Sequence, residues 1–242
     1  MGAPPFVVLL PPSEGKATGG NPGSAWLPES GVFAGTLGPW RRDVALALKK
    51  QKGGNEKLLG VKGVHLARAT EQNRALIGSP SLPAWQRYTG VVWDHLDLGS
   101  VPSSVRQAIV RRIFVPSGLA GLVRADDPLP DYRLKMGARL APFGTVGSWW
   151  RDDLTEALAG EVASTVVVDL LPQEHRSAIE WSRLVSVVRV DLVAKKGGVV
   201  GGHNAKAAKG LLARHLLLGK NASVSSLITS FTHPDYSAKE AP

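Results

Sequence analysis

Cysteine is absent from this sequence of 242 residues. Its absence excludes disulfide bonds, a thiolate nucleophile, thiolate zinc sites and cysteine-ligated iron–sulfur clusters. The six histidines are scattered, and none has the HxH or HxxxH spacing that directs two ligands to one metal ion. We therefore expect no resident metal and no cofactor, since any metal would have to rely on isolated histidines and carboxylates.

Long apolar runs are also missing. No stretch reaches the roughly 18 apolar residues that a membrane-spanning helix requires. The opening segment, MGAPPFVVLLPP, has no basic leader, and its apolar run is only five residues long. This segment is shorter than the apolar region of a secretory signal, so the sequence predicts a cytoplasmic protein.

Acidic residues are scarce relative to basic ones. The chain has 20 Asp and Glu against 29 Lys and Arg, which gives a net charge of +9. A balance this basic favours a polyanionic partner, most simply nucleic acid or a nucleotide. The alternative is a basic protein that has no such partner.

Apolar runs alternate with amphipathic segments along the chain. Residues 6–10 and 165–171 predict buried strands because both runs are nearly all apolar, and residues 184–193 alternate like a half-buried strand. Residues 18–38 are rich in Gly, Pro and Ser and predict an irregular connection. Helices are predicted at residues 40–50, 103–114, 147–160, 174–182 and 205–219. The fold class expected is mixed α/β, with one compact domain over residues 1–242 and a mixed sheet flanked by helices.

Small residues, turn formers and charges crowd residues 116–140, PSGLAGLVRADDPLPDYRLKMGARL, which we call the central stretch. Glycine permits close approach of backbone to a ligand, and proline fixes φ, so the pattern is typical of a binding site. A surface loop capped by ion pairs is the alternative. The candidate site residues in this stretch are Ser117, Gly118, Arg124, Asp126, Tyr132 and Arg133.

Two further candidates precede the central stretch. The loop of Ser13, Glu14, Gly15 and Lys16, called here the 13–16 loop, follows the first predicted strand. Backbone N–H groups beside one ammonium are typical of an anion cradle, although the GxxxxGK[ST] pattern of a Walker A motif is absent. Farther along lie Arg87 and Tyr88, which would contact a phosphate and stack on a base.

The predicted helix at residues 205–219 carries Lys206, Lys209, Gly210 and Ala213 on one face. Two lysines beside small residues let another surface approach closely, and a phosphate backbone is one such surface. The alternative is close packing of a second helix on Gly210 and Ala213, with the lysines in solvent.

A glycine turn, GVKG at residues 60–63, precedes another predicted helix. This turn resembles the helix-hairpin-helix of DNA-binding proteins, in which backbone N–H groups of the turn face a phosphate. The usual pattern has glycines two apart, whereas here they are three apart.

Five segments together resemble the YaaA family of bacterial peroxide-stress proteins. They are PPSEGK at 11–16, RYTGVVWDHLD at 87–97, SGLAGLVRADDPLPDYRLKMGARL at 117–140, SWWRDDL at 148–154 and NAKAAKGLLARHLL at 204–217. The third is the most specific, because family members usually read there as SGLYG, then RP with an Asp, then YRLEMG. The chain departs from this pattern with Ala120 for Tyr, Ala125 for Pro and Lys135 for an acidic residue, and residues 170–179 also differ.

The resemblance implies a cytosolic, mainly monomeric, single-domain mixed α/β protein. It also implies a basic cleft and a helix-hairpin-helix-like element of the kind found in DNA-binding proteins. The role it implies is resistance to hydrogen peroxide, by limiting free iron and oxidative damage to DNA.

The first functional hypothesis is binding of nucleic acid, as duplex DNA with distorted or open structure, in a basic groove. Tyr88 would stack on exposed bases in that groove. The phosphate contacts would be Lys16, Arg87, Arg124, Arg133, Lys206 and Lys209.

The second hypothesis is an enzyme that acts on a nucleotide or nucleobase. The 13–16 loop would hold a phosphate, Tyr132 and Arg133 would clamp the rest, and Glu14 or an aspartate of the central stretch would be the base. A closed pocket walled by Lys16, Tyr132 and Arg133 would favour the enzyme, and an open trough of duplex width would favour DNA. A third interpretation is a basic interaction module that neither binds DNA nor catalyses a reaction.

Overall fold

A mixed sheet of six strands forms the centre of the computed structural model, which describes residues 6–195, 202–219 and 222–241. The strands β1, β4, β9 and β10 run parallel, whereas the edge strands β5 and β11 are antiparallel to their neighbours. The predicted mixed sheet is thereby confirmed. The spatial order is β11 (Tyr236–Glu240), β10 (Val187–Ala194), β9 (Val166–Asp169), β1 (Phe6–Leu9), β4 (Ile113–Ser117) and β5 (Gly121–Arg124).

Two smaller antiparallel sheets stand beside the large one. They comprise β2 (Asn21–Ala25), β3 (Pro80–Pro83) and β6 (Pro128–Pro130), and then β7 (Arg139–Leu140) with β8 (Gly144–Thr145). The first α-helices are α1 (Ala34–Lys50), α2 (Glu56–Leu59), α3 (Gly63–Arg74), α4 (Ala84–Arg87) and α5 (Val91–Leu96). The later ones are α6 (Ser103–Val110), α7 (Val146–Glu161), α8 (Gln173–Arg176), α9 (Gly202–Leu218) and α10 (Val224–Ser230). Two 3₁₀ turns lie at Leu98–Ser100 and Trp181–Arg183.

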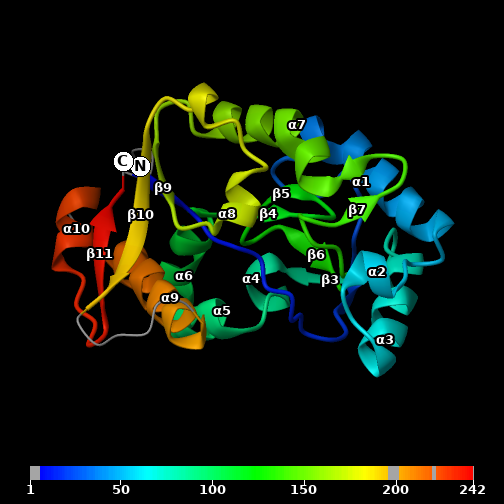
Figure 1. Ribbon diagram of the computed structural model, residues 1–242, viewed down its shortest axis with the longest axis horizontal. Helices are drawn as coiled ribbons and strands as arrows, with labels where there is room; N and C mark the ends of the chain where they lie inside the picture. The colour runs from blue at the N-terminus through cyan, green and yellow to red at the C-terminus, as the bar shows by residue number, and fades with distance from the viewer. Residues whose placement is uncertain (1–5, 196–201, 220–221, 242) are drawn as a thin grey trace.

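Helices cover both faces of the six-stranded sheet, as predicted (Figure 1). α1 and α7 lie together along the top of the view in Figure 1 and contact β5 as well as each other. α5, α6 and α9 lie below the sheet in the same view, where α5 packs along α9. The apolar side chains of these layers form one continuous core.

β1 is buried on both faces because its four residues, FVVL, are all apolar. Val8 and Leu9 are fully buried, and Val8 is paired with Val168 of β9 on one side and with Ile113 of β4 on the other. Burying a side chain of this size contributes about 1.5–3 kcal/mol relative to leaving it exposed. The short strand is therefore held in the middle of the sheet by packing on every side.

The strand order reverses at β1. The chain runs from β1 to β4 and β5 on one side and later returns to β9 and β10 on the other. In open α/β sheets, ligands bind outside the carboxyl ends of the strands at such a switch point. The loop that leaves β1 here is the 13–16 loop, and the start of the central stretch leaves β4 beside it.

Three element predictions were wrong. The helix predicted at residues 174–182 is only the four residues of α8, which are followed by turns and by the 3₁₀ turn at Trp181–Arg183. The helix predicted at residues 103–114 ends at Val110, and Ile113 and Phe114 belong to β4. The apolar spacing of those residues suits a helix face as well as a buried strand, so periodicity could not separate the two. β2 lies inside the predicted irregular connection, where its exposed residues NPGSA carry no strand pattern.

α1 begins six residues before its predicted start at residue 40 and includes Pro39. Glycine and proline in the first turns argue against helix on propensity alone. The buried side chains of Leu37, Val44 and Leu48 supply the packing that overrides that preference.

The predicted glycine turn joins α2 to α3. Gly60 and Gly63 have φ values of 64° and 54°, in the left-handed region that favours glycine. The Asn55 side chain caps α2 by accepting a hydrogen bond from the Leu58 N–H at 3.0 Å. The chain thus contains two helices joined by a glycine turn, as expected for a helix-hairpin-helix-like element.

Gly210 is the point where α9 and α5 meet. A Cβ on Gly210 would lie 2.3 Å from the Val92 carbonyl oxygen and 2.8 Å from the His95 Cβ. Ala213 is fully buried, whereas Lys206 is exposed. The interpretation of close helix packing is therefore correct for the two small residues.

We expect Gly210→Ala to lower the free energy of unfolding by about 1–3 kcal/mol, because the added methyl group would overpack against the α5 backbone. Gly160→Ala on α7 is the matched control, since nothing lies within 4 Å of a Cβ at that position. The control should be neutral or stabilising by up to about 1 kcal/mol, because alanine is the better helix former. Urea denaturation measures both variants, and equal stability of the two would contradict the close packing.

Candidate functional site

The 13–16 loop is fixed against the segment that follows α4. The Ser13 hydroxyl donates a hydrogen bond to the Thr89 carbonyl, and the Thr89 N–H donates to the Gly15 carbonyl at 3.1 Å. Lys16 forms an isolated β-bridge with Tyr88. The loop therefore has a defined position outside the carboxyl end of β1.

Two hollows open on either side of the 13–16 loop, and both include Glu14 and Gly15 in their walls. The first, which we call the α3 cavity, has a volume of about 400 Å³. Its polar wall consists of Glu14, Lys16, His65, Arg68, Gln72, Thr89, Asp131, Tyr132 and Arg133. The second, the α9 cavity, has a volume of about 610 Å³. Its polar wall consists of Ser13, Glu14, Glu174, His175, Lys206 and Lys209.

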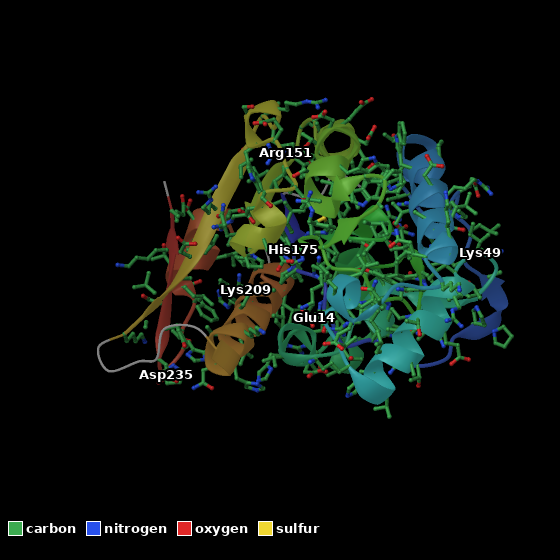
Figure 2. The ribbon with its side chains drawn as sticks, turned by 45° about the vertical axis from the view of Figure 1, so that its right-hand side comes forward. Glu14, Lys49, Arg151, His175, Lys209 and Asp235 are labelled. Carbon is green, nitrogen blue, oxygen red and sulfur yellow. The ribbon has the colours of Figure 1, made fainter. Side chains whose placement is uncertain are left out.

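A narrow passage of about 50 Å³ runs beside the loop between these hollows. It shares Lys16, Tyr132 and Arg133 with the α3 cavity, and Ser13 and His175 with the α9 cavity. Figure 2 shows the labelled side chains of Glu14, His175 and Lys209 grouped in the middle of the molecule, between α9 and α3. The two hollows are thus parts of one face.

Lys16 has the most unusual surroundings in the site. Its ammonium nitrogen donates a hydrogen bond to the Ser13 carbonyl at 2.9 Å, and it lies 4.2 Å from the ring centroid of Tyr132. Burial lowers the pKa of Lys16 to about 7, although the Asp131 carboxylate acts in the opposite direction. The positive charge of Arg133 adds to the lowering. A large fraction of this side chain is therefore neutral amine near neutral pH.

A chain of buried hydroxyl groups backs Lys16. The Tyr132 hydroxyl lies 2.8 Å from the Ser117 hydroxyl and 3.1 Å from that of Tyr88. Burial raises the pKa of both tyrosines, so both phenols remain protonated at neutral pH. The wall behind the lysine is therefore rigid and uncharged.

Glu14 is held between two cations. One carboxylate oxygen accepts a hydrogen bond from Arg133 at 2.6 Å, and the other lies 2.6 Å from the ammonium of Lys135. Burial opposes ionisation of Glu14, but Lys135 and Arg133 together outweigh it and lower the pKa of the carboxyl group. A carboxylate with a lowered pKa is a weak base, so its position here suits orienting Arg133.

Arg68 connects α3 to the 13–16 loop. Its guanidinium group donates to the Asp131 carboxylate at 2.6 Å and to the Lys16 carbonyl at 3.1 Å. Asp131 belongs to the central stretch, so this one side chain joins three segments that are distant in sequence. α3, the longer helix of the helix-hairpin-helix-like element, thereby becomes one wall of the α3 cavity.

The α9 cavity has a second lysine with a lowered pKa. The Lys209 ammonium donates to the Leu170 carbonyl at 2.5 Å, and burial lowers the pKa of Lys209 to about 8, with Arg176 adding to the effect. The Nδ1 atom of His175 is buried and has no hydrogen-bond partner in the described part of the chain. Burial also lowers the pKa of His175, so the imidazole is neutral at neutral pH.

Arg87 and Tyr88 are not available to a ligand, and this corrects two sequence predictions. The Arg87 side chain is fully buried, and its guanidinium group donates to the carbonyl oxygens of Ala17, Gly19 and Leu129. Tyr88 is only 2% exposed and packs on the ring of Trp93. Arg87 therefore cannot reach a phosphate, and Tyr88 cannot stack on a base.

Arg124 and Asp126 lie apart from both cavities. They form a two-pronged ion pair at 2.6 and 3.1 Å at the end of β5. Asp126 borders a separate surface hollow together with Arg111. The prediction that Arg124 contacts phosphate in the same groove as Lys16 is therefore not supported by its position.

Ser117 lies behind the cavities, and Gly118 borders the narrow passage between them. Ser117 is fully buried, and its hydroxyl group orients Tyr132. A Cβ on Gly118 would lie 2.4 Å from the Leu134 carbonyl oxygen, so only glycine lets the two backbones come this close. These residues position Tyr132 and Leu134.

Sequence reasoning missed Arg68, Asp131, Lys135 and His175 as site residues. Asp131 and Lys135 lie in the central stretch, where only their proximity to other charges marked them. Arg68 belongs to the helix after the glycine turn, which was marked only by its resemblance to a helix-hairpin-helix, and the segment of His175 gave no sign of a site. Their place at the cavities follows from the fold alone.

Among residues 6–195, 202–219 and 222–241, no three His, Asp or Glu side chains gather in a way that could hold a metal ion. Within the same residues, no helix combines the length and the apolar character needed to cross a membrane.

We expect Lys16→Met to raise the melting temperature near pH 7 by roughly 2–4 °C for each kcal/mol gained. The folded pKa of about 7 lies below that of an unfolded lysine, so the unfolded chain binds more protons between about pH 7 and 10.5. Stability of the unchanged protein should therefore rise with pH across this window. The difference in melting temperature between Lys16→Met and the unchanged protein should therefore shrink from about pH 7 to 10.5 in calorimetric scans. A difference that does not change with pH would contradict the lowered pKa of Lys16.

Comparison with known proteins places the chain in a family. Residues 7–241 match the family model described as peroxide stress protein YaaA. A UPF0246 protein of Streptomyces coelicolor is 36% identical over 218 residues, covering 88% of this chain and 83% of the relative. A second, from Corynebacterium glutamicum, is 32% identical over 221 residues, covering 89% and 86%. A third, from Idiomarina loihiensis, is 32% identical over 191 residues, covering 74% and 72%. The family match spans nearly the whole chain, and the chain belongs to the peroxide stress protein YaaA family.

Proposed function

We propose that the protein binds nucleic acid across the two cavities, with one nucleotide unit in the α3 cavity and backbone phosphates beside α9. The observation that carries the proposal is the convergence of cations from distant segments. Lys16, Arg133 and Lys209 border hollows that meet at the 13–16 loop. Cations gathered on one face form the electrostatic footprint of a polyanion site.

The edges of the face that holds the α3 and α9 cavities suit phosphate groups. Lys206 is exposed at the α9 cavity, and Lys209 lies one helical turn farther along the same face of α9. On the opposite side, α3 begins at the glycine turn and carries Arg68 into the α3 cavity. A strand of nucleic acid laid over the 13–16 loop would meet positive charge on both sides of it.

The size of the α3 cavity favours a distorted duplex over an intact one. A volume of about 400 Å³ lies in the range of small-molecule pockets and is far too small for a double helix. One nucleotide drawn out of the base stack fits such a space, and unstacking is easiest where the duplex is already open or damaged. The proposed ligand is therefore duplex DNA with a distorted or open site.

The second candidate function is an enzyme that acts on a nucleotide or nucleobase. It is favoured by the lowered pKa of Lys16, since a contact that only neutralises phosphate gains nothing from losing its charge. In that case the cavity would take a free nucleotide, with Arg133 holding its phosphate.

The cellular role that we propose rests on the family. A peroxide stress protein that binds open or damaged DNA would limit oxidative and iron-dependent damage to that DNA. We propose further that the protein acts in the cytoplasm and as a monomer, as the resemblance to the family implies.

We expect the double variant Lys206→Ala, Lys209→Ala to bind a DNA oligomer with an unpaired loop about tenfold or more weakly. Loss of two phosphate contacts should also reduce the slope of log affinity against log salt by about 1.8. Fluorescence anisotropy over a range of salt concentrations measures both quantities. The matched control is Lys49→Ala, Lys50→Ala, which removes two exposed lysines from the far end of α1. An equal loss in the control would show that only net charge matters and would remove α9 from the site.

A comparison of ligands separates the two candidate functions. We expect the oligomer with an unpaired loop to bind about tenfold more tightly than a fully paired duplex, because the bases of the loop are already unstacked. Thermal-shift measurements with both oligomers and with single mononucleotides make the comparison. A shift with one mononucleotide and none with DNA would reverse the ranking in favour of the enzyme.

A further inference from the structure

We infer that Lys16 is an amine nucleophile that forms an imine with a sugar aldehyde, namely C1′ of a base-less deoxyribose in DNA. The inference rests on the proposed binding of nucleic acid and assigns to it a covalent step. It starts from three features of Lys16: its place in the α3 cavity, its lack of a counter-ion and the uncharged wall behind it.

The place of Lys16 suits a nucleophile. Its side chain borders both the α3 cavity and the narrow passage, so a ligand in either would meet it. The Ser13 carbonyl at 2.9 Å and the Tyr132 ring at 4.2 Å hold the amine in position. Neither group carries a negative charge or accepts a proton from Lys16 at neutral pH. Both therefore orient the nitrogen without forming an ion pair with it.

The charges around Lys16 are paired with one another and not with it. Arg68 pairs with Asp131, while Arg133 and Lys135 share Glu14. Within the described residues, no carboxylate lies within 4.0 Å of the Lys16 ammonium. A lysine left without a counter-ion beside other cations holds its proton weakly.

The neutral form is the reactive one. With the pKa of Lys16 at about 7, roughly half of the amine is unprotonated near neutral pH. For an ordinary lysine the neutral fraction is below about one in a thousand at the same pH. Desolvation of this kind is how proteins activate lysine for imine formation with carbonyl compounds.

The rest of the α3 cavity indicates the aldehyde. Arg133 and Arg68 are suited to phosphate oxygens, so the substrate class is a sugar aldehyde that carries phosphate. A base-less deoxyribose in DNA has a phosphate on each side and exposes its C1′ aldehyde when the ring opens. It also brings no base into a cavity of about 400 Å³ and is the easiest nucleotide unit to extrude from a duplex. Free sugar phosphates also combine an aldehyde with a phosphate, and the comparison with free deoxyribose 5-phosphate below distinguishes them from a base-less site in DNA.

The step balances without an oxidant or reductant. The neutral amine attacks the aldehyde carbon, a C–N bond forms, and the carbonyl electron pair moves to oxygen, which takes up a proton while the nitrogen, positively charged after the attack, releases one. The resulting carbinolamine loses a proton from nitrogen and its hydroxyl group as water. The product is an imine with a C=N bond, and the sum of the reaction is amine plus aldehyde giving imine plus water.

Reductive trapping tests the inference. The full chain is incubated with cyanoborohydride and an oligomer that carries one base-less site, so that any imine becomes a stable secondary amine. We expect a covalent protein–DNA adduct on a denaturing gel, with Lys16 identified by mass spectrometry of the digest. Lys16→Met should reduce the adduct at least about a hundredfold, whereas Lys49→Met on α1 should leave it unchanged.

The pH dependence of trapping distinguishes a nucleophile from a lysine with a purely structural role. We expect the trapping rate to level off above about pH 7 and to fall about tenfold for each pH unit below it. An ordinary surface lysine instead gains neutral amine up to about pH 10, so its trapping rate divided by that of Lys16 should keep rising above about pH 7. A ratio that stays constant from about pH 7 to 10 would overturn the assignment of Lys16.

Binding of DNA and covalent trapping at Lys16 are measured separately, so the proposed function and the imine inference can fail independently. Anisotropy that shows binding of the base-less oligomer, without any adduct, overturns the imine inference and leaves the proposed function standing. Loss of both signals overturns both. An adduct on Lys16 with free deoxyribose 5-phosphate, but none with DNA, overturns the assignment of DNA as the substrate.

Discussion

The position of β1 is the constraint on which the site depends. Because β4 and β9 pair with it on either side, the chain that leaves β1 can emerge only at the carboxyl edge of the sheet. That edge is where the strand order reverses, and the 13–16 loop lies there between segments that belong to both halves of the chain. The loop then divides the space into the α3 and α9 cavities. One short apolar strand thereby sets the place of Lys16, beside which α3, α9 and the central stretch bring the other cations.

Electrostatics explains why Lys16 differs from its neighbours. Each carboxylate near the α3 cavity is already bound by an arginine or a lysine, as in the pairs of Arg68 with Asp131 and of Arg133 with Glu14. Those pairs keep the arginines in place at little energetic gain, since partly exposed ion pairs contribute only about 0–1 kcal/mol. Lys16 is left with a carbonyl oxygen and two aromatic rings, which orient its nitrogen without fully replacing the lost hydration. The arrangement favours reactivity over stability.

The sequence was a good guide where a segment had a single compatible environment. Residues 6–10 and 165–171 could only be buried strands, and the loop that ends at Lys16 follows the first of them directly. The sequence was a poor guide to which arginine side chains face a ligand. Arg87 and Arg68 look alike in the sequence, yet Arg87 is buried against carbonyl oxygens and Arg68 borders the α3 cavity. Which of them faces a ligand depends on tertiary packing that no local pattern encodes.

The departures from the usual family pattern have unequal consequences. Ala120 and Ala125 are fully buried, and their carbonyl groups accept hydrogen bonds from Arg41 and from the Trp85 N–H, outside the walls of both cavities. They change packing in the core and leave the chemistry of the site alone. Lys135 is different, because its ammonium lies 2.6 Å from Glu14. An acidic residue there would repel Glu14 and add negative charge near Lys16, which would favour its protonated form. The lysine at this position instead pairs with Glu14 and adds a positive charge to the wall of the narrow passage.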